Sequence, residues 1–383
     1  MELAVLSANL RRLRGAKGMT QGDLADAAGI SRVGYRNIEG GTSAPKVDTL
    51  MRIAEALQVN LQVLVTPVRT LSAVRFRADK KMTTRTELLA DVGRWLDNYN
   101  ELEELLGDRR AYALAAEAKK IARLPRENRA QKAAISAREK MGLGDESSIR
   151  DICGLLEHHG IKVYTPQLAS EGFFGLSVAE RDRGPAVIVN TWERLSVERW
   201  IFTAAHELGH LLMHLDAYDV AKTDEDSEQE KEADAFASYF LMPEDLFNRE
   251  YEESRGLSLV KRVFKLKRIF RVSWQSVLYR IAAKSSDRGA VWGRFQAEYK
   301  RMTTRTLGKT DEPQPLETAA FARPPAKVAD EPEHLVSSDF IEDRLSRLVR
   351  RAIEESAISL GRAAEILDLD LIEMRDRANS WVE

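Results

Sequence analysis

Two histidines and one glutamate in the middle of the chain have the residue types and spacing of a metal-dependent hydrolytic site. The segment that begins at Phe202 reads Phe-Thr-Ala-Ala-His-Glu-Leu-Gly-His, so His206 and His210 lie four residues apart. Residues four apart share one face of a helix, so both imidazoles could bind one Zn²⁺. Glu207 would then lie beside the open position of the metal and could act as a general base. This HExxH pattern predicts a zinc peptidase centre.

A zinc site of this kind needs a third protein ligand, and an acidic segment downstream offers several carboxylates. Residues 228–237 read Glu-Gln-Glu-Lys-Glu-Ala-Asp-Ala-Phe-Ala. We favour Glu230 as the ligand, with Asp234 one turn further along orienting a histidine in the second shell. Asp234 as the ligand is the main alternative, and Glu232 is expected to point nearer the solvent. His214 is expected to face solvent or to support the site rather than to bind the metal.

Short strands and two helices are predicted around these residues. The runs 161–164, 175–178 and 186–189 are apolar or β-branched and bounded by Gly or Pro, which predicts strands. Helical patterns follow over about 196–215 and 228–241. These elements are those that a minimal zincin needs to position an HExxH helix.

Other residues near the predicted site carry weaker signals. Tyr164, Tyr218 and Tyr239 could each stabilise an oxyanion, but nothing in their spacing selects one, so we interpret each as a core or surface tyrosine. Phe173 and Phe174 lie between two glycines at a predicted strand edge. An extended substrate could add there as a further strand, and packing of both rings in the core is the alternative.

The N-terminal region predicts a DNA-binding element. Two short helices, Thr20 to Ala28 and Ser31 to Glu39, flank a turn at Gly29, which is the pattern of a helix-turn-helix. The second helix would enter the major groove of DNA, where side chains reach base edges and phosphates. The candidate DNA contacts are Gln21, Ser31, Arg32, Tyr35, Arg36 and Asn37.

Both regions resemble known families. Residues 4–65 resemble the XRE/Cro/CI repressors through Met19-Thr-Gln-Gly-Asp-Leu-Ala, Gly29-Ile-Ser-Arg, Asn37-Ile-Glu-Gly-Gly and Pro45-Lys-Val-Asp-Thr-Leu. About residues 150–245 resemble the ImmA/IrrE (M78-like) metallopeptidases through Gly172-Phe-Phe-Gly, Ala186-Val-Ile-Val-Asn, the HExxH segment, Glu230-Lys-Glu-Ala-Asp and Leu241-Met-Pro. The first resemblance implies a dimer on a palindromic operator. The second implies that His206, His210 and an acidic residue of the following helix bind zinc, with Glu207 as general base.

The bulk composition places these regions in a multidomain chain. One cysteine excludes an internal disulfide framework, and neither a signal peptide nor an apolar run long enough to span a membrane is apparent, so a cytoplasmic location is expected. The expected fold is α+β and mostly α. The predicted segments are a helix-turn-helix domain of four or five helices at 1–66, a charged helical connector or dimerisation region at 67–145, a zincin-like domain at 146–300, a Pro-rich linker at 301–335 and a small helical element at 336–383.

These features predict a DNA-binding regulator with a zinc endopeptidase domain. The resemblance implies regulated cleavage of an XRE-type repressor, a partner or the chain itself, in a stress response or in the response of a phage or mobile element. One alternative is a transcription factor whose zincin-like domain senses a metal or ligand without proteolysis. Another is an antitoxin-type regulator that acts through protein contacts. The intact Glu207 favours the peptidase, because a pure sensor has no chemical need for a base beside its metal.

Overall fold

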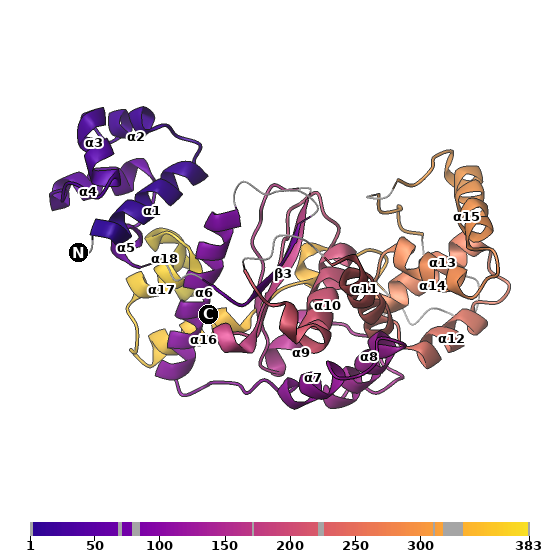
Figure 1. Ribbon diagram of the computed structural model, residues 1–383. Helices are drawn as coiled ribbons and strands as arrows, with labels where there is room; N and C mark the ends of the chain where they lie inside the picture. Colours follow the sequence, from indigo (N-terminus) through magenta and orange to yellow (C-terminus); the bar gives the residue numbers. More distant parts are fainter. Residues whose placement is uncertain are drawn as a thin grey trace. The chain divides into compact units, whose positions relative to one another are not determined.

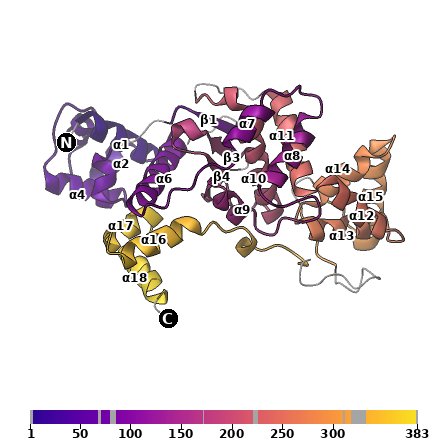
Figure 2. The same ribbon diagram turned by 90° about the horizontal axis from the view of Figure 1, so that it is seen from below.

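The structure is a computed structural model that describes residues 3–67, 71–78, 85–170, 172–220, 226–308, 311–316 and 332–381. The chain divides into two compact units, the first made of residues 1–71, 81–109 and 345–383 and the second of residues 72–80 and 110–344. Most of the described residues are helical and one four-stranded sheet is present, so the predicted class of a mostly α multidomain protein is confirmed (Figures 1 and 2).

The first unit begins with the five short helices of the predicted helix-turn-helix domain. They enclose a core of their own, to which Leu6, Leu24, Tyr35 and Ile53 contribute fully or almost fully buried side chains. The helices of this unit are α1 (Leu3–Ala16), α2 (Gln21–Ala27), α3 (Arg32–Glu39), α4 (Val47–Ala56), α5 (Leu61–Val65), α6 (Arg85–Leu105), α16 (Arg344–Glu354), α17 (Leu360–Leu367) and α18 (Leu371–Ser380).

The second unit combines the sheet with two groups of helices. Its strands are β1 (Val74–Ala78), β2 (Lys162–Tyr164), β3 (Phe173–Val178) and β4 (Ala186–Val189). Its helices are α7 (Ala115–Ile121), α8 (Arg129–Lys140), α9 (Ile152–His158), α10 (Val197–Met213), α11 (Ser227–Leu241), α12 (Glu244–Glu253), α13 (Leu259–Phe270), α14 (Trp274–Ala283) and α15 (Arg288–Thr303). Helix α10 packs against β3 and β4, and α11 lies beside α10 (Figure 1).

The sheet has the strand order β1-β3-β4-β2. Strand β3 runs antiparallel to both of its neighbours, β1 and β4, whereas β4 and β2 are parallel. The three strands predicted from the sequence are confirmed. Every residue of β3 and β4 is buried. Helix α10 packs against both strands, and apolar side chains of β4 and of the helices of the second unit form one core.

Strand β1 was not predicted, and the prediction that the segment from 67 to about 140 is helical is wrong at residues 74–78. The stretch Val-Arg-Phe-Arg-Ala alternates apolar and basic residues, which is a strand pattern. Its flanks are rich in charge and read as helix, and the strand forms because it pairs with β3, about 100 residues away in sequence. The predicted connector at 67–145 therefore contributes residues to both compact units. The domain boundaries given from the sequence remain a prediction.

Among the described residues, no helix is both long and apolar enough to cross a membrane. Residues 309–310 and 317–331 of the predicted linker lie outside the described residues.

Replacement of Gly160 by alanine is expected to destabilise the second unit strongly. Gly160 joins α9 to β2 with φ +77°, and a Cβ there would lie 2.3 Å from the carbonyl oxygen of Ala111. Gly142 in the same unit has φ +69° and open space around the position of a Cβ. Gly142→Ala should lower the free energy of unfolding by about 1–2 kcal/mol through backbone strain alone. Gly160→Ala should lower it by about 1–3 kcal/mol more, because the backbone must also move.

Urea unfolding of the whole chain followed by circular dichroism would measure both variants. Equal losses of stability would mean that the contact with Ala111 is not a constraint on the fold.

Candidate functional site

Helix α10 carries the HExxH residues, and its first turn is fixed by a capping side chain. Ser196 precedes the helix, and its Oγ accepts a hydrogen bond from the backbone N–H of Arg199 at 3.3 Å. His206, Glu207 and His210 are fully buried where α10 faces the sheet and α11. The helical spacing places both imidazoles on one side, with their Nε2 atoms 2.9 Å apart.

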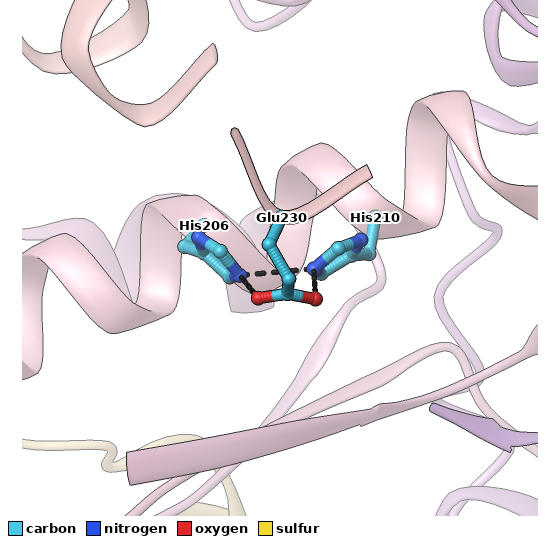
Figure 3. Close-up of side chains that lie close together, drawn as sticks. All are labelled: His206, His210 and Glu230. Carbon is cyan, nitrogen blue, oxygen red and sulfur yellow. Dashed lines mark hydrogen bonds and ion pairs between the residues drawn. The ribbon is translucent and has the colours of Figure 1, made fainter. Parts of the chain in front are cut away.

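Helix α11 brings the carboxylate of Glu230 to the two histidines. Its Oε2 lies 3.3 Å from Nε2 of His206, and its Oε1 lies 3.3 Å from Nε2 of His210. One ligand atom from each of the three residues lies within 4.8 Å of the other two. Figure 3 shows the carboxylate of Glu230 next to both histidines, with one oxygen beside the facing nitrogen of each imidazole ring.

The donor set fits a zinc ion. Imidazole nitrogens and a carboxylate oxygen are ligands that Zn²⁺ takes, and bonds of about 2.0–2.1 Å in a tetrahedron separate the ligand atoms by about 3.3–3.4 Å. Each carboxylate oxygen of Glu230 lies at that separation from the Nε2 of one histidine, whereas the two Nε2 atoms, 2.9 Å apart, are closer together than that. The three residues could therefore hold a metal after small movements of the histidine rings.

A glycine in the HExxH segment permits this approach of the two helices. A Cβ on Gly209 would lie 2.9 Å from the ring of Phe236 on α11, closer than real contacts of this kind. Phe236 is fully buried and stacks on Phe240 one turn later. The absence of a side chain at position 209 thus sets the distance between α10 and α11, and with it the position of Glu230.

Further polar residues fix the orientation of the two histidines. Nδ1 of His206 lies 2.8 Å from Oδ1 of Asp234, and Nδ1 of His210 lies 2.8 Å from Nδ1 of His214. Nε2 of His214 in turn lies 3.1 Å from the carboxylate of Glu232. Contacts of this kind choose the tautomer and the ring orientation of a metal-binding histidine.

Two expectations for these residues are corrected. Glu232 does not point toward solvent: its side chain is 9% exposed and accepts two hydrogen bonds from the guanidinium of Arg129, at 2.6 and 2.5 Å. His214 is buried, so only the supporting position, and not the solvent-facing one, agrees with the structure. The helical wheel of α11 places Glu232 away from His206, but α8 covers that side of the helix and supplies Arg129.

Burial and hydrogen bonding set the charge states of His210, His214 and Glu230. Burial lowers the pKa of His210 well below its usual value, and burial likewise lowers the pKa of His214 to about 4. Burial acts to raise the pKa of Glu230, but the hydrogen bonds with His206 and His210 outweigh it and hold that pKa well below its usual range. Neutral imidazole and ionised carboxylate are the forms that bind a metal.

Glu207 belongs to a second group of polar side chains on the sheet side of α10. Its Oε2 accepts a hydrogen bond from Oγ of Ser177 on β3 at 2.7 Å, and Oγ of Ser177 lies 2.9 Å from the hydroxyl of Tyr218. A Cβ on Gly175 of β3 would lie 2.6 Å from the side chain of Thr203, so the strand backbone lies directly against α10. Burial raises the pKa of Tyr218 well above its usual value, so its hydroxyl stays protonated.

Sequence reasoning missed three residues that contact the site. Tyr218 was interpreted as a core or surface tyrosine, and Ser177 was not considered. Arg75 of β1 was also missed: its guanidinium bonds Oε1 of Glu230 at 2.8 Å and Oε1 of Gln229 at 2.6 Å. These residues come from segments far apart in the chain, so no local spacing connects them with the HExxH pattern.

The helix-turn-helix forms as predicted from its local signals. Thr20 and Asp23 make a capping box at the start of α2, and Oγ of Ser31 accepts a hydrogen bond from the backbone N–H of Gly34 at 3.1 Å at the start of α3. Gly29 forms the turn with φ +63°, a conformation that glycine adopts without strain.

The candidate DNA contacts divide between exposed and buried positions. Ser31, Arg32 and Arg36 are exposed, and Asn37 is half-buried. The expectation that Tyr35 is exposed is wrong, because its ring is fully buried and its hydroxyl donates to Oε1 of Glu39 at 3.0 Å. Tyr35 shares the core-facing side of α3 with Ile38.

Gln21 is engaged within the domain. Its side-chain amide donates to the buried carboxylate of Glu39, which also accepts a hydrogen bond from Nε of Arg14 at 2.7 Å. Because the carboxylate of Glu39 accepts hydrogen bonds from Arg14, Gln21 and Tyr35, it fixes α1, α2 and α3 to one another.

Comparisons with known proteins agree with both halves of this description. Residues 10–64 match the helix-turn-helix family, and residues 156–282 match the family of peptidase M78, described as the IrrE N-terminal-like domain. The chain is 38% identical over 61 residues to the HTH-type transcriptional regulator YqaE of Bacillus subtilis, which covers 16% of this chain and 53% of that protein. It is 38% identical over 63 residues to the HTH-type transcriptional regulator y4dJ of Sinorhizobium fredii, which covers 16% of this chain and 82% of that protein.

Removal of the guanidinium of Arg129 is expected to destabilise the second unit. Arg129→Met leaves the carboxylate of Glu232 buried with a reduced set of partners, and breaking a buried ion pair on one side lowers stability by about 3–5 kcal/mol. Arg249→Met is the matched control, because Arg249 pairs with Glu146 at the surface, where such a pair contributes about 0–1 kcal/mol. Chemical denaturation of both variants measures the difference, and losses of the same size would show that the buried pair does not hold α8 to α11.

Proposed function

Because the chain belongs to the XRE-type helix-turn-helix transcriptional regulators and carries an IrrE-like domain of the peptidase M78 family, we propose that it binds an operator and cleaves a repressor-type protein. The cluster of His206, His210 and Glu230 beside Glu207 is the observation that carries the peptidase part of the proposal. The protein that is cleaved is a partner of the XRE type or the chain itself, and the response belongs to stress or to a phage or mobile element.

The proposed cofactor is Zn²⁺, held by His206, His210 and Glu230. Asp234 and His214 would orient the two imidazoles through their Nδ1 atoms. When bound, the zinc would polarise the carbonyl of the scissile peptide bond and lower the pKa of a water molecule. Asp234 as third ligand is less well supported, because its carboxylate lies on the far side of the His206 ring from the other two ligand atoms.

Glu207 is proposed to move the proton in the reaction. Its carboxylate takes a proton from the attacking water and delivers it to the leaving amine, which requires a fixed orientation. The hydroxyl of Ser177 donates to Oε2 of Glu207, and Tyr218 holds that hydroxyl in place. Ser177 and Tyr218 are therefore positioning residues. Burial of Glu207 under β3 strengthens its electrostatic interactions with the reacting groups.

Metal content and cleavage of purified variants test this part of the proposal. We expect the native chain and Glu207→Gln to contain one zinc per chain, and only the native chain to cleave an XRE-type repressor or itself. Glu230→Ala should lose the metal, because it removes a ligand. Asp234→Ala should keep it with an affinity about 10–100-fold lower, as removal of an orienting partner does.

The outcomes separate the candidate functions. Zinc without cleavage in every variant would favour a transcription factor that senses a metal or ligand. Zinc retained by Glu230→Ala and lost by Asp234→Ala would reverse the ligand assignment. A chain that binds no zinc would contradict the proposed peptidase and leave a regulator that acts through protein contacts.

The DNA-binding part of the proposal assigns α3 to the major groove. The exposed residues Ser31, Arg32 and Arg36 and the half-buried Asn37, at the start and on the outer side of α3, would contact the duplex. Because the side-chain amide of Gln21 donates to Glu39, Gln21 is proposed to contact a phosphate through its backbone N–H at the start of α2. Helix-turn-helix proteins bind two half-sites through two-fold symmetry, so the proposed active form is a homodimer.

Replacement of an exposed arginine of α3 is expected to weaken DNA binding. Against a duplex selected by the native chain from random sequences, Arg36→Ala should bind about 10–100-fold more weakly, as loss of a base or phosphate contact does. Arg375→Ala removes the same charge from an exposed position on α18 and is the control. Fluorescence anisotropy at fixed salt measures both affinities. Equal affinities of the two variants would exclude α3 as the recognition helix.

A further inference from the structure

Strand β1 lies at the edge of the sheet that is next to the candidate metal centre. The strand order β1-β3-β4-β2 makes β3 the neighbour of β1, and β3 is the strand whose Ser177 contacts Glu207 of α10. An extended peptide that added to β3 from the side opposite β4 would take the place that β1 occupies. Antiparallel addition of a strand to a sheet edge is a common way in which proteins bind peptides.

The register of β1 directs one of its side chains into the site. Arg75 lies opposite Ser177, and residues directly opposite each other in a sheet project to the same face. Ser177 reaches Glu207 from that face, and Arg75 reaches Glu230 and Gln229 on α11. The side chains of both arginine and glutamate in this ion pair are largely buried, with 11% and 14% of their surface exposed. A single basic side chain thus spans the distance from the edge strand to the proposed ligand cluster.

The other contacts of this segment use its main chain. The N–H groups of Ser72 and Ala73 donate to Oδ2 of Asp182, and the carbonyl of Ala73 accepts from the N–H of Ala179. The carbonyl of Ser72 accepts from the N–H of Val220. Any extended peptide carries these groups, so the edge of β3, together with Ala179, Asp182 and Val220 beside it, can bind a peptide backbone at these positions and a basic side chain opposite Ser177.

The path of the chain sets β1 apart from the other strands. Residues 72–80 belong to the compact unit that holds the metal cluster, whereas the residues before and after them, 1–71 and 81–109, belong to the other unit. Strand β1 is therefore a short segment that is covalently tethered at both ends to the unit that contains the DNA-binding helices. A tethered segment competes with a free peptide at a high effective concentration, of the order of millimolar for short linkers.

We propose that the edge of β3 is the peptide-binding edge of the IrrE-like domain and that residues 71–78 are its resident occupant. Peptides that replace this segment are extended and carry a basic residue opposite Ser177, where Glu230 and Gln229 receive it. The consequence for catalysis rests on the proposed function: a protein substrate gains access to Glu207 when β1 leaves the edge. Release of β1 is then the step at which a signal in the DNA-binding unit controls the peptidase.

The test uses the full chain and a fluorescein-labelled peptide with the sequence of residues 71–78, Leu-Ser-Ala-Val-Arg-Phe-Arg-Ala. In one variant, Val74→Cys and Val178→Cys replace two residues that lie directly opposite each other. Opposite Cα atoms of antiparallel strands are about 4.5–5.5 Å apart, which a disulfide bond spans. Oxidation then fastens β1 to β3, and reduction releases it. In a second variant, Arg75→Pro weakens the pairing of β1 for two reasons. Proline has no backbone N–H to donate to β3, and the substitution removes the ion pair of Arg75 with Glu230.

Binding of the labelled peptide is measured by fluorescence anisotropy, which needs neither the metal nor catalysis. We expect the oxidised double-cysteine chain to bind the peptide at least ten-fold more weakly than the reduced chain, and Arg75→Pro to bind it at least ten-fold more tightly than the native chain. A peptide with glutamate in place of the arginine that corresponds to Arg75 should bind at least ten-fold more weakly to Arg75→Pro. The two single-cysteine variants, treated in the same way, are the controls and should not respond to oxidation.

The results distinguish this inference from the proposed peptidase function. Equal peptide binding by the oxidised and reduced chains, or no gain in Arg75→Pro, would overturn the inference. Cleavage of a repressor at the native rate by the oxidised chain would overturn it as well, while supporting the peptidase. If the oxidised chain binds the peptide more weakly than the reduced chain but neither form cleaves a repressor, the peptide-binding edge is supported and the peptidase function is contradicted.

Discussion

The close packing of α11 on α10 is the constraint on which the rest of the candidate site depends. Gly209 offers no side chain, and the ring of Phe236 occupies the space that a Cβ would need. This contact determines how near Glu230 comes to His206 and His210, since all three positions are fixed on rigid helices. A site assembled on helices holds its ligand atoms more accurately than a site assembled on loops. The glycine inside the HExxH segment is thus as much a part of the site as the residues that could bind the metal.

Buried polar networks give this packing its specificity. In the second unit, Arg129, Glu232 and His214 form a chain of contacts that ends at the imidazole of His210. In the helix-turn-helix domain, the carboxylate of Glu39 gathers polar side chains from three helices in the same manner. Groups of this kind lower stability when one member is missing, because a buried charge then lacks partners. Each network therefore favours a single relative placement of the helices that contribute to it.

The candidate site is assembled from distant parts of the sequence. Helices α10 and α11 supply the proposed ligands and base, β3 supplies Ser177, and β1 supplies Arg75. The segment that carries β1 connects the residues of the DNA-binding helices with those of α6, all of which belong to the other compact unit. The chain therefore runs without interruption from the helix-turn-helix helices to the edge of the sheet beside His206, His210 and Glu230. This short strand is thus a covalent connection between the unit that contains the helix-turn-helix and the unit that contains the IrrE-like domain.

The local signals in the sequence determined the helices of the helix-turn-helix, α10 and α11, the residues of the HExxH segment and, among the described residues, three of the four strands. Helical spacing alone puts His206 and His210 on one face, and capping residues such as Thr20 and Ser31 mark where helices begin. The tertiary structure decided which neighbours these residues meet. Strand β1 exists because β3 offers it a partner, and Tyr35 is buried because the other helices of its domain cover it. The side chain of Glu232 is only 9% exposed because α8 packs over it and supplies Arg129. Local patterns report which face of an element is apolar, whereas the contacts of a polar side chain depend on segments that only folding brings together.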